Sequence, residues 1–132
     1  MNSRKDTQIT LRLYLTPDIY LGPGKADVLR GIRDTGSISA TGRISGMSYK
    51  RTWQLVDRMN RDFQQPLVLT ATGGQHGGGA TLTREGVKVL KLYERIMASA
   101  LKGMSRDVGQ LKKMIHRQRE MIPDRWPSQA GR

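Results

Sequence analysis

The sequence contains no cysteine, and histidine occurs only twice. The absence of cysteine excludes a disulfide framework and any thiolate metal site. His76 and His116 lie far apart and no HExxH spacing occurs, so a histidine-based metal centre is not expected. No Ser-His-Asp set or paired carboxylate site can be assembled either. We therefore expect a protein that is not an enzyme and that carries no metal and no cofactor.

Long apolar runs are also absent. No stretch approaches the roughly 20 apolar residues that a helix needs to span a bilayer, and residues 1–6 lack the hydrophobic region of a signal peptide. A cytoplasmic location is expected. The 132 residues are enough for one domain with a buried core, but not for a second full domain.

Acidic residues are scarce. The chain has 23 Lys plus Arg against 11 Asp plus Glu, a formal net charge of +12. No Asp or Glu occurs between Asp34 and Asp57, and none from Phe63 to Arg84. A polyanion can approach such segments without local repulsion, which favours double-stranded DNA as the partner. The basic, amphipathic residues 102–119 leave a membrane-surface interaction as an alternative for that segment, although no membrane partner is expected.

Residues 36–60 have the pattern of a helix-turn-helix. Ser37 can cap a short helix that runs to about Ser45, and Gly46 suits the tight turn that follows. Ser48 can cap a longer second helix, and Gly42 lies where two crossing helices must approach closely. One face of the second helix is predicted to be buried: Thr52, Leu55, Val56, Met59 and Phe63.

The other face of this second helix is polar and basic, and it supplies most of the predicted DNA-binding residues. Lys50, Arg51 and Gln54 are expected to enter the major groove, because they stand on the outward face of the first two turns. Ser48 and Tyr49 are expected to lie nearest the phosphates. Trp53 is on the flank of the buried stripe, so core packing is favoured for it over DNA contact. The predicted DNA-binding residues of the two helices are Ser37, Ser39, Ser48, Tyr49, Lys50, Arg51, Gln54 and Arg58.

The segments before the helix-turn-helix predict a strand and a helix. Residues 8–16 alternate between apolar and polar side chains, which is typical of a strand with one buried face. Residues 21–24 predict a turn, and residues 25–34 predict the first helix of a three-helix core. The apolar positions are Ile9, Leu11, Leu13 and Leu15 in the strand, and Val28, Leu29 and Ile32 in the helix.

After Phe63 the pattern changes to that of a β-hairpin. Residues 67–72 are rich in strand formers, residues 73–79 are rich in glycine, and residues 80–82 predict the returning strand. A hairpin that directly follows a recognition helix is a wing, and its tip, with Gln75 and His76, is expected to contact DNA. A nucleotide-binding loop is not expected, since the glycines lack the Gly-Lys-Ser/Thr ending.

The final helix is predicted to begin after Thr83 and to reach Ile115. Such a helix spans roughly 50 Å at about 1.5 Å per residue, too long for one small domain to cover its apolar seam. A homodimer is therefore expected, although Gly103 and Gly109 favour a break or fraying. The predicted dimerisation residues are Leu90, Tyr93, Met97, Leu101, Met104, Val108, Leu111 and Ile115. Intramolecular packing is expected to cover residues 87–93.

These residues together resemble the N-terminal DNA-binding domain of ModE-type molybdenum-dependent transcriptional regulators, over about residues 8–115. The resemblance rests on five stretches: Gly36-Ser37-Ile38-Ser39, Ser48-Tyr49-Lys50 with Trp53, Met59-Asn60, the glycine-rich wing from Ala71 to Ala80, and Leu82-Thr83. It implies an α+β fold, a winged helix-turn-helix related to that of LysR-type regulators, with an N-terminal strand, a three-helix core, a two-stranded wing and a long C-terminal dimerisation helix. The predicted organisation is a DNA-binding domain over 1–83, the dimerisation helix over 84–120 and a flexible tail over 121–132.

Two departures from the family pattern are informative. Thr70 and Gln75 stand where the family has basic residues near the start and tip of the wing, so backbone contact passes to His76. The family's molybdate sensor lies in a separate pair of small β-barrel domains, and nothing in these 132 residues resembles an oxyanion site, so molybdate is not expected to bind this chain. The predicted function is sequence-specific transcriptional regulation from a palindromic operator. The alternative is a sequence-independent architectural DNA-binding protein.

Overall fold

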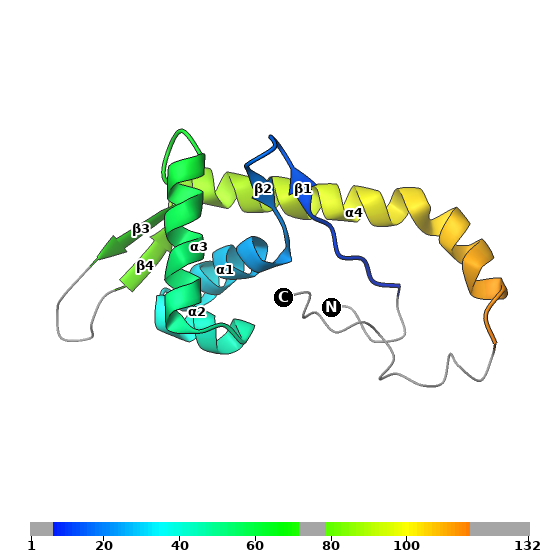
Figure 1. The fold of residues 1–132 in the computed structure, drawn as a ribbon, viewed down its shortest axis with the longest axis horizontal. Coiled ribbons are helices and arrows are strands. Elements are labelled where there is room, and N and C mark those ends of the chain that lie inside the picture. Colours follow the sequence, from blue (N-terminus) through cyan, green and yellow to red (C-terminus); the bar gives the residue numbers. More distant parts are fainter. Residues whose placement is uncertain (1–6, 72–78, 117–132) are drawn as a thin grey trace. The chain divides into compact units, whose positions relative to one another are not determined.

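The computed structural model describes residues 7–71 and 79–116 (Figure 1). Two compact units divide the chain within its last helix: residues 11–95 form one, and the described residues before 11 and after 95 belong to the other. The elements in chain order are β1 (Leu13–Tyr14), β2 (Tyr20–Leu21), α1 (Pro23–Thr35), α2 (Ile38–Ser45), α3 (Tyr49–Asp62), β3 (Val68–Ala71), β4 (Gly79–Leu82) and α4 (Arg84–Lys113). The predicted α+β class, with a three-helix core, a two-stranded hairpin after α3 and a long final helix, is confirmed.

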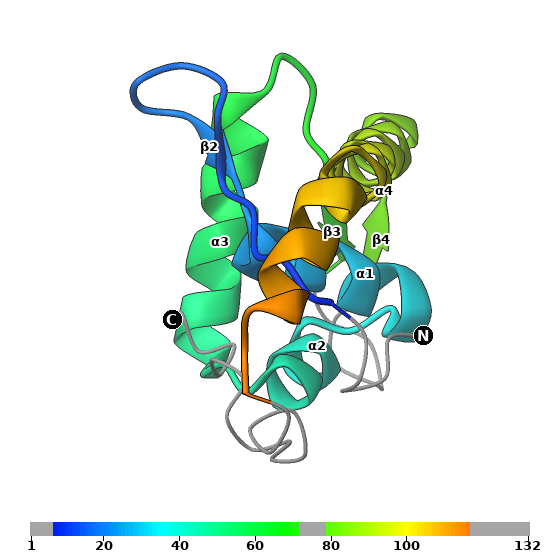
Figure 2. The ribbon, with the colours of Figure 1, turned by 90° about the vertical axis from the view of Figure 1, so that its right-hand side faces the viewer.

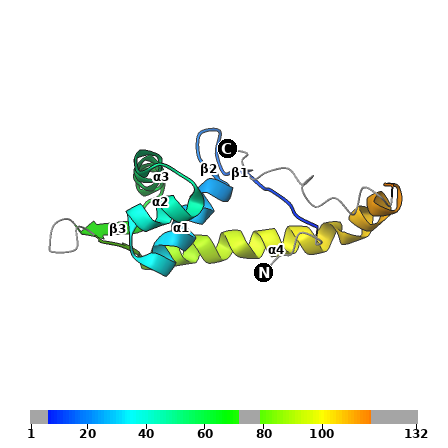
Figure 3. The same ribbon diagram turned by 90° about the horizontal axis from the view of Figure 1, so that it is seen from below.

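Helix α1 is the centre of the unit formed by residues 11–95. It lies between α3 and the first turns of α4 (Figures 2 and 3), and Val28, Leu29 and Ile32 are buried on it as predicted. Burying a large apolar side chain contributes about 1.5–3 kcal/mol. The packing of the other helices around α1 therefore holds this unit together.

Small residues let α2 cross its neighbours closely. A Cβ atom on Gly42 would lie 2.8 Å from Thr52 Oγ1 and 3.0 Å from the carbonyl oxygen of Met47. A Cβ atom on Gly31 of α1 would lie 2.5 Å from Thr41 Cγ2. Thr41 and Thr52 are fully buried, and their hydroxyls donate to backbone carbonyls four residues earlier. The predicted close approach at Gly42 is thus confirmed and fixes the angle between α2 and α3.

The prediction of a strand over residues 8–16 was wrong in extent, and so was the turn at 21–24. Strand β1 covers only Leu13–Tyr14, β2 pairs antiparallel with it, and α1 begins at Pro23. Leu15 is 52% exposed instead of buried. The reason is a tight turn in which the N–H groups of Leu15 and Thr16 both donate to the carbonyl oxygen of Ile19, so the chain reverses directly after Tyr14.

Helix α4 begins where it was predicted, because Thr83 Oγ1 accepts a hydrogen bond from Gly86 N at 3.0 Å. It continues through Gly103 and Gly109 to Lys113, so neither the predicted break nor fraying occurs at these glycines, and the helix ends before the predicted end at Ile115. Helical glycine costs about 1 kcal/mol, which the rest of a 30-residue helix outweighs. None of the helices in the described ranges combines the length and apolarity needed to cross a bilayer.

Candidate nucleic-acid interface

Helix α3 has the start that was predicted for a recognition helix. Ser48 Oγ accepts a hydrogen bond from Arg51 N at 3.0 Å and caps the helix. Its hydroxyl proton stays available to donate to an external acceptor such as a phosphate oxygen. The predicted stripe is buried at Thr52, Leu55, Val56 and Met59. Phe63 lies just past the helix end and is half-buried.

The basic face of α3 divides into a front half and a rear half. Lys50, Arg51 and Gln54 in the front half are exposed, and among residues 7–71 and 79–116 no carboxylate lies within ion-pair distance of Lys50 or Arg51. In the rear half, Arg61 pairs with Asp57 at 3.1 Å, and Arg58 Nε lies 3.4 Å from Asp62 Oδ2. The positive charge that no acid neutralises is therefore concentrated in the first two turns, where base contacts were predicted.

Two aromatic side chains border this front half. Tyr49 is 58% exposed, and Trp53 is half-buried. Their ring centroids are 6.3 Å apart with an interplanar angle of 78°, an edge-to-face arrangement that aromatic pairs prefer. Trp53 thus holds Tyr49 in place at the helix start, and the Tyr49 hydroxyl can reach outward.

The start of α2 adds two of the predicted serines. Ser37 Oγ caps α2 by accepting from Ala40 N at 3.0 Å, and Ser39 is exposed. Gly46 in the turn before α3 has a φ of 71°, in the left-handed region that glycine adopts without strain. The helix-turn-helix geometry predicted from these residues is confirmed.

Strands β3 and β4 form the antiparallel hairpin that follows α3. Val68 pairs with Leu82, Thr70 with Ala80, and Ala71 with Gly79. The amide of Ala80 donates to the carbonyl oxygen of Gly36 at 2.9 Å, which ties β4 to the junction of α1 and α2. Gln75 and His76, the predicted wing-tip contacts, lie outside the described residues.

Asn60 sets the position of this hairpin, a role that the sequence did not reveal. Its Oδ1 accepts hydrogen bonds from Leu67 N at 2.9 Å and Val68 N at 3.1 Å, and its Nδ2 donates to the Val68 carbonyl oxygen at 3.0 Å. One side chain of α3 therefore provides hydrogen-bond partners for three backbone groups at the start of β3. The available signal was a lone asparagine in the last turn of an amphipathic helix, close before a buried strand.

A buried lysine at the start of α1 was also missed. Lys25 is 2% exposed, and its Nζ donates to the carbonyl oxygen of Tyr20 at 2.9 Å and lies 3.9 Å from Asp62 Oδ2. Burial is the main cause of a lowered pKa for Lys25, and the positive charges of Arg58, Arg12 and Arg51 lower it further, while Asp62 opposes the shift. Cationic side chains from α1, from α3 and from the residue before β1 thus gather at one place, where Asp62 is the only carboxylate of the described residues that pairs with them.

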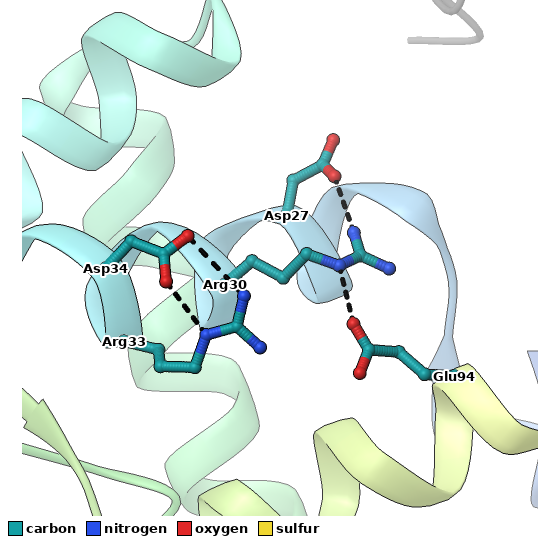
Figure 4. A network of polar contacts seen from close by, with 5 residues as sticks. All are labelled: Asp27, Arg30, Arg33, Asp34 and Glu94. Carbon is teal, nitrogen blue, oxygen red and sulfur yellow. Dashed lines mark hydrogen bonds and ion pairs between the residues drawn. The ribbon is translucent and has the colours of Figure 1, made fainter. Parts of the chain in front are cut away.

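Further ion pairs join arginines of α1 to acidic side chains of α1 and α4 (Figure 4). Arg30 binds Asp27 at 3.0 Å and Glu94 at 2.9 Å, and Arg33 binds Asp34 at 2.9 Å. Burial is the main cause of a raised pKa for Asp27, and Arg30 opposes the shift. These partly exposed pairs contribute little stability individually. Asp27, Asp34 and Glu94 thus pair with arginines outside α3.

The predicted dimerisation seam of α4 requires a correction at its start. Leu90 and Tyr93 are 2% and 3% exposed because they are buried in their own unit, where the Tyr93 hydroxyl donates to the Leu11 carbonyl oxygen at 2.8 Å. These two side chains have no surface left for a second copy. Further along, Met97, Leu101, Met104 and Val108 are half-buried. Leu111 and Ile115 are 62% and 51% exposed.

The three-helix core, the glycine turn between α2 and α3, and the antiparallel hairpin after α3 define a winged helix-turn-helix domain. No family model matches the sequence. Similarity to characterised proteins covers about two thirds of the chain. The chain is 40% identical to the transcriptional regulator ModE of Yersinia pestis over 87 residues, which are 66% of this chain and 33% of that protein. The DNA-binding transcriptional dual regulator ModE of Escherichia coli K12 is 39% identical over the same shares.

A third relative, the molybdenum-pterin-binding protein MopB of Rhodobacter capsulatus, is 42% identical over 85 residues, 64% of this chain and 32% of that protein. Over the matched residues, the predicted resemblance to ModE-type transcriptional regulators is confirmed. The chain spans about a third of the length of these relatives. A solved structure of BpsR from Bordetella bronchiseptica covers 75% of this chain and 83% of its own, with 20% identity and a TM-score of 0.49, a likeness too weak to support a conclusion.

Proposed function

We propose that this chain is a sequence-specific DNA-binding transcriptional regulator of the ModE type, with α3 as its recognition helix. The observation that carries the proposal is the exposure of Lys50, Arg51 and Gln54 in the front half of α3, where neither Lys50 nor Arg51 has an ion-pair partner in the described part of the chain. Arginine pairs with the O6 and N7 acceptors of guanine, and glutamine with the N6 and N7 of adenine. The names of the relatives support regulation by DNA binding, and they support molybdenum-related gene control as its context.

In this proposal, the residues around the groove contacts bind the DNA phosphates. Ser48 and Tyr49 at the start of α3, with Ser37 and Ser39 at the start of α2, present hydroxyl groups near the helix N-termini. Both the hydroxyls and the helix ends favour anions. These contacts position the recognition helix without reading sequence, whereas Lys50, Arg51 and Gln54 supply the discrimination.

We further propose that the regulator acts as a homodimer through the outer half of α4. The exposed Leu111 continues the stripe of the half-buried Met97, Met104 and Val108, and the exposed Ile115 follows just past the helix end. Pairing of two copies removes this apolar surface from water. Two-fold symmetry then requires an operator of two inverted half-sites, about one turn of DNA apart.

A sequence-independent architectural protein is the second candidate, because a net charge of +12 alone favours binding to any duplex. The test is to mix the purified protein with fragments of its own genome at about 0.15 M salt and to sequence the bound DNA. A recurring imperfect palindrome supports the regulator. Uniform recovery of all fragments supports the architectural protein, and no recovery contradicts both.

A further inference from the structure

The β1–β2 hairpin lies beside α3 and projects on the side of the domain that α3 occupies, away from the first turns of α4 (Figures 2 and 3). A direct contact links the two elements: Arg58 Nη2 of α3 donates to the carbonyl oxygen of Asp18 in the hairpin turn at 3.5 Å. The hairpin therefore flanks the rear half of the proposed recognition helix. Any duplex that holds α3 in its groove has a sugar-phosphate strand beside this helix.

Lys25 fixes the hairpin in this position. Its Nζ binds the Tyr20 carbonyl oxygen at 2.9 Å, lies 3.7 Å from the centroid of the Tyr20 ring, and reaches within 3.9 Å of Asp62 on α3. A buried cation with these contacts joins β2, α1 and α3. The hairpin is thus a rigid extension of the helix-turn-helix, which lowers the entropic cost of any contact that it makes.

Arg12 is the cation that this hairpin presents to solvent. It directly precedes β1, it is exposed, and its guanidinium carbon lies 4.5 Å from the centroid of the Tyr20 ring. Over the described ranges, no carboxylate lies within ion-pair distance of Arg12. Stacking on the aromatic ring restricts the side chain, and a hydrogen bond with Tyr14 is the main cause of a raised pKa for Arg12. A guanidinium carries five N–H donors, so it can bind an external acceptor beside these contacts.

These contacts leave a local excess of positive charge. Arg12, Lys25 and Arg58 converge there with Asp62 as the only carboxylate that an ion pair joins to them, among residues 7–71 and 79–116. The Asp62 side chain is itself only 13% exposed, and it pairs with Arg58 and Lys25. An external anion would balance this charge, and the planar, five-donor guanidinium of Arg12 matches a phosphate well.

We propose that the β1–β2 hairpin is a second DNA-backbone-binding element in which Arg12, held by Tyr20 and Lys25, binds a phosphate of the strand that flanks the recognition helix. This inference rests on the proposed function, because it takes α3 to lie in the major groove. It extends the contact surface of the domain to a hairpin that precedes the three-helix core.

A purely structural role for the Arg12–Tyr20 contact makes a different set of predictions. If Arg12 only stabilises the hairpin, its replacement lowers the stability of the fold without changing the salt dependence of DNA binding. If Arg12 binds a phosphate, its replacement weakens binding to all sequences alike and lowers the slope of log K against log salt by about 0.9 for each bound copy.

The experiment compares Arg12→Gln with Arg95→Gln, a control that removes an equal charge from an exposed position on α4. Affinity is measured on a duplex selected from the genome and on an unrelated duplex, over a series of salt concentrations. We expect Arg12→Gln to weaken binding roughly 3- to 10-fold on both duplexes and to lower the slope, and Arg95→Gln to change neither. Arg12→Lys keeps the charge, so it should retain most of the slope.

Two results would overturn the inference. One is Arg12→Gln behaving like Arg95→Gln while Arg51→Ala still weakens binding to the selected duplex, in which case the proposed function stands without the hairpin contact. The other is an equal loss in Arg12→Lys and Arg12→Gln, which would assign the effect to packing on Tyr20. Failure of the wild type to prefer the selected duplex would instead contradict the proposed function itself.

Discussion

Asn60 and Val68 exchange two hydrogen bonds: Asn60 Nδ2 donates to the Val68 carbonyl oxygen at 3.0 Å, and Asn60 Oδ1 accepts from Val68 N at 3.1 Å. These two bonds take the place of those that a neighbouring strand would make with Val68, the first residue of β3. It fixes the hairpin after α3 to the last turn of the helix, so the position of the wing follows from that of the proposed recognition helix.

We expect Asn60→Ala to lower the free energy of unfolding by about 2–4 kcal/mol, because it leaves the buried backbone groups of Leu67 and Val68 without partners. Chemical denaturation measures this loss. Gln64→Ala, at an exposed position just after α3, is the control and should change stability by less than about 0.5 kcal/mol. Equal effects of the two substitutions would show that Asn60 does not anchor the wing.

Two glycine-to-alanine substitutions should change stability in opposite directions. Gly42→Ala places a Cβ atom 2.8 Å from Thr52 Oγ1 in a buried crossing, so we expect a loss of about 1–3 kcal/mol. Gly103→Ala in α4 meets nothing within 4 Å, and we expect a gain of up to about 1 kcal/mol from helix propensity. Thermal unfolding of both variants tests the pair. A stabilising Gly42→Ala would contradict the close approach of α2 and α3.

Local signals predicted much of this fold correctly. The caps at Ser37 and Ser48, the glycine turn and the buried stripe of α3 each depend on residues within a few positions of one another. The errors concern features that strand alternation and helical spacing do not encode. Leu15 has the right alternation for a buried strand, but the turn closed by Ile19 ends the strand first. Likewise, the sequence around Lys25 does not indicate that its side chain is buried in contact with Tyr20 and Asp62.

The same limit applies to the candidate interface. Helical spacing placed Lys50, Arg51 and Gln54 on one exposed face, since the period of a helix is local information. The apolar seam of α4 was also predicted from helical spacing. Spacing alone does not show that Leu90 and Tyr93 pack within their own unit. The neighbours of an apolar stripe are set by tertiary structure, which periodicity alone does not encode.

The lowered pKa of Lys25 predicts a pH dependence of stability. A folded-state pKa below the ordinary value of 10.5 means that the unfolded chain binds this proton more tightly, so stability rises as pH increases from the lowered pKa towards 10.5 and is lost as pH falls through it. Relative to Lys25→Met, which cannot titrate at this position, the wild type should gain stability as pH rises from the lowered pKa towards 10.5. Denaturation of both proteins across this window measures the difference. A wild type that loses stability relative to the variant as pH rises would contradict the shift.

The outer half of α4 is where charge should disrupt the proposed dimer. We expect Met104→Lys with Leu111→Lys to give a folded monomer with greatly weakened DNA binding, because two buried charges cannot be accommodated in an apolar interface. Ser99→Lys with Gln110→Lys adds the same charge at exposed positions and is the control. Sedimentation at tens of micromolar measures the state of association. A monomeric wild type, or a double variant that still dimerises, would place the interface elsewhere.

The central claim is that α3 reads DNA sequence, and the ratio of two dissociation constants tests it most directly. At about 0.15 M salt, the wild type should bind the selected duplex at least roughly 10³-fold more tightly than an unrelated duplex. Arg51→Ala or Gln54→Ala should cost about 1–3 kcal/mol on the selected duplex and less on the unrelated one, so the ratio falls. A wild-type ratio near one, or equal losses on both duplexes in both variants, would contradict sequence recognition by α3.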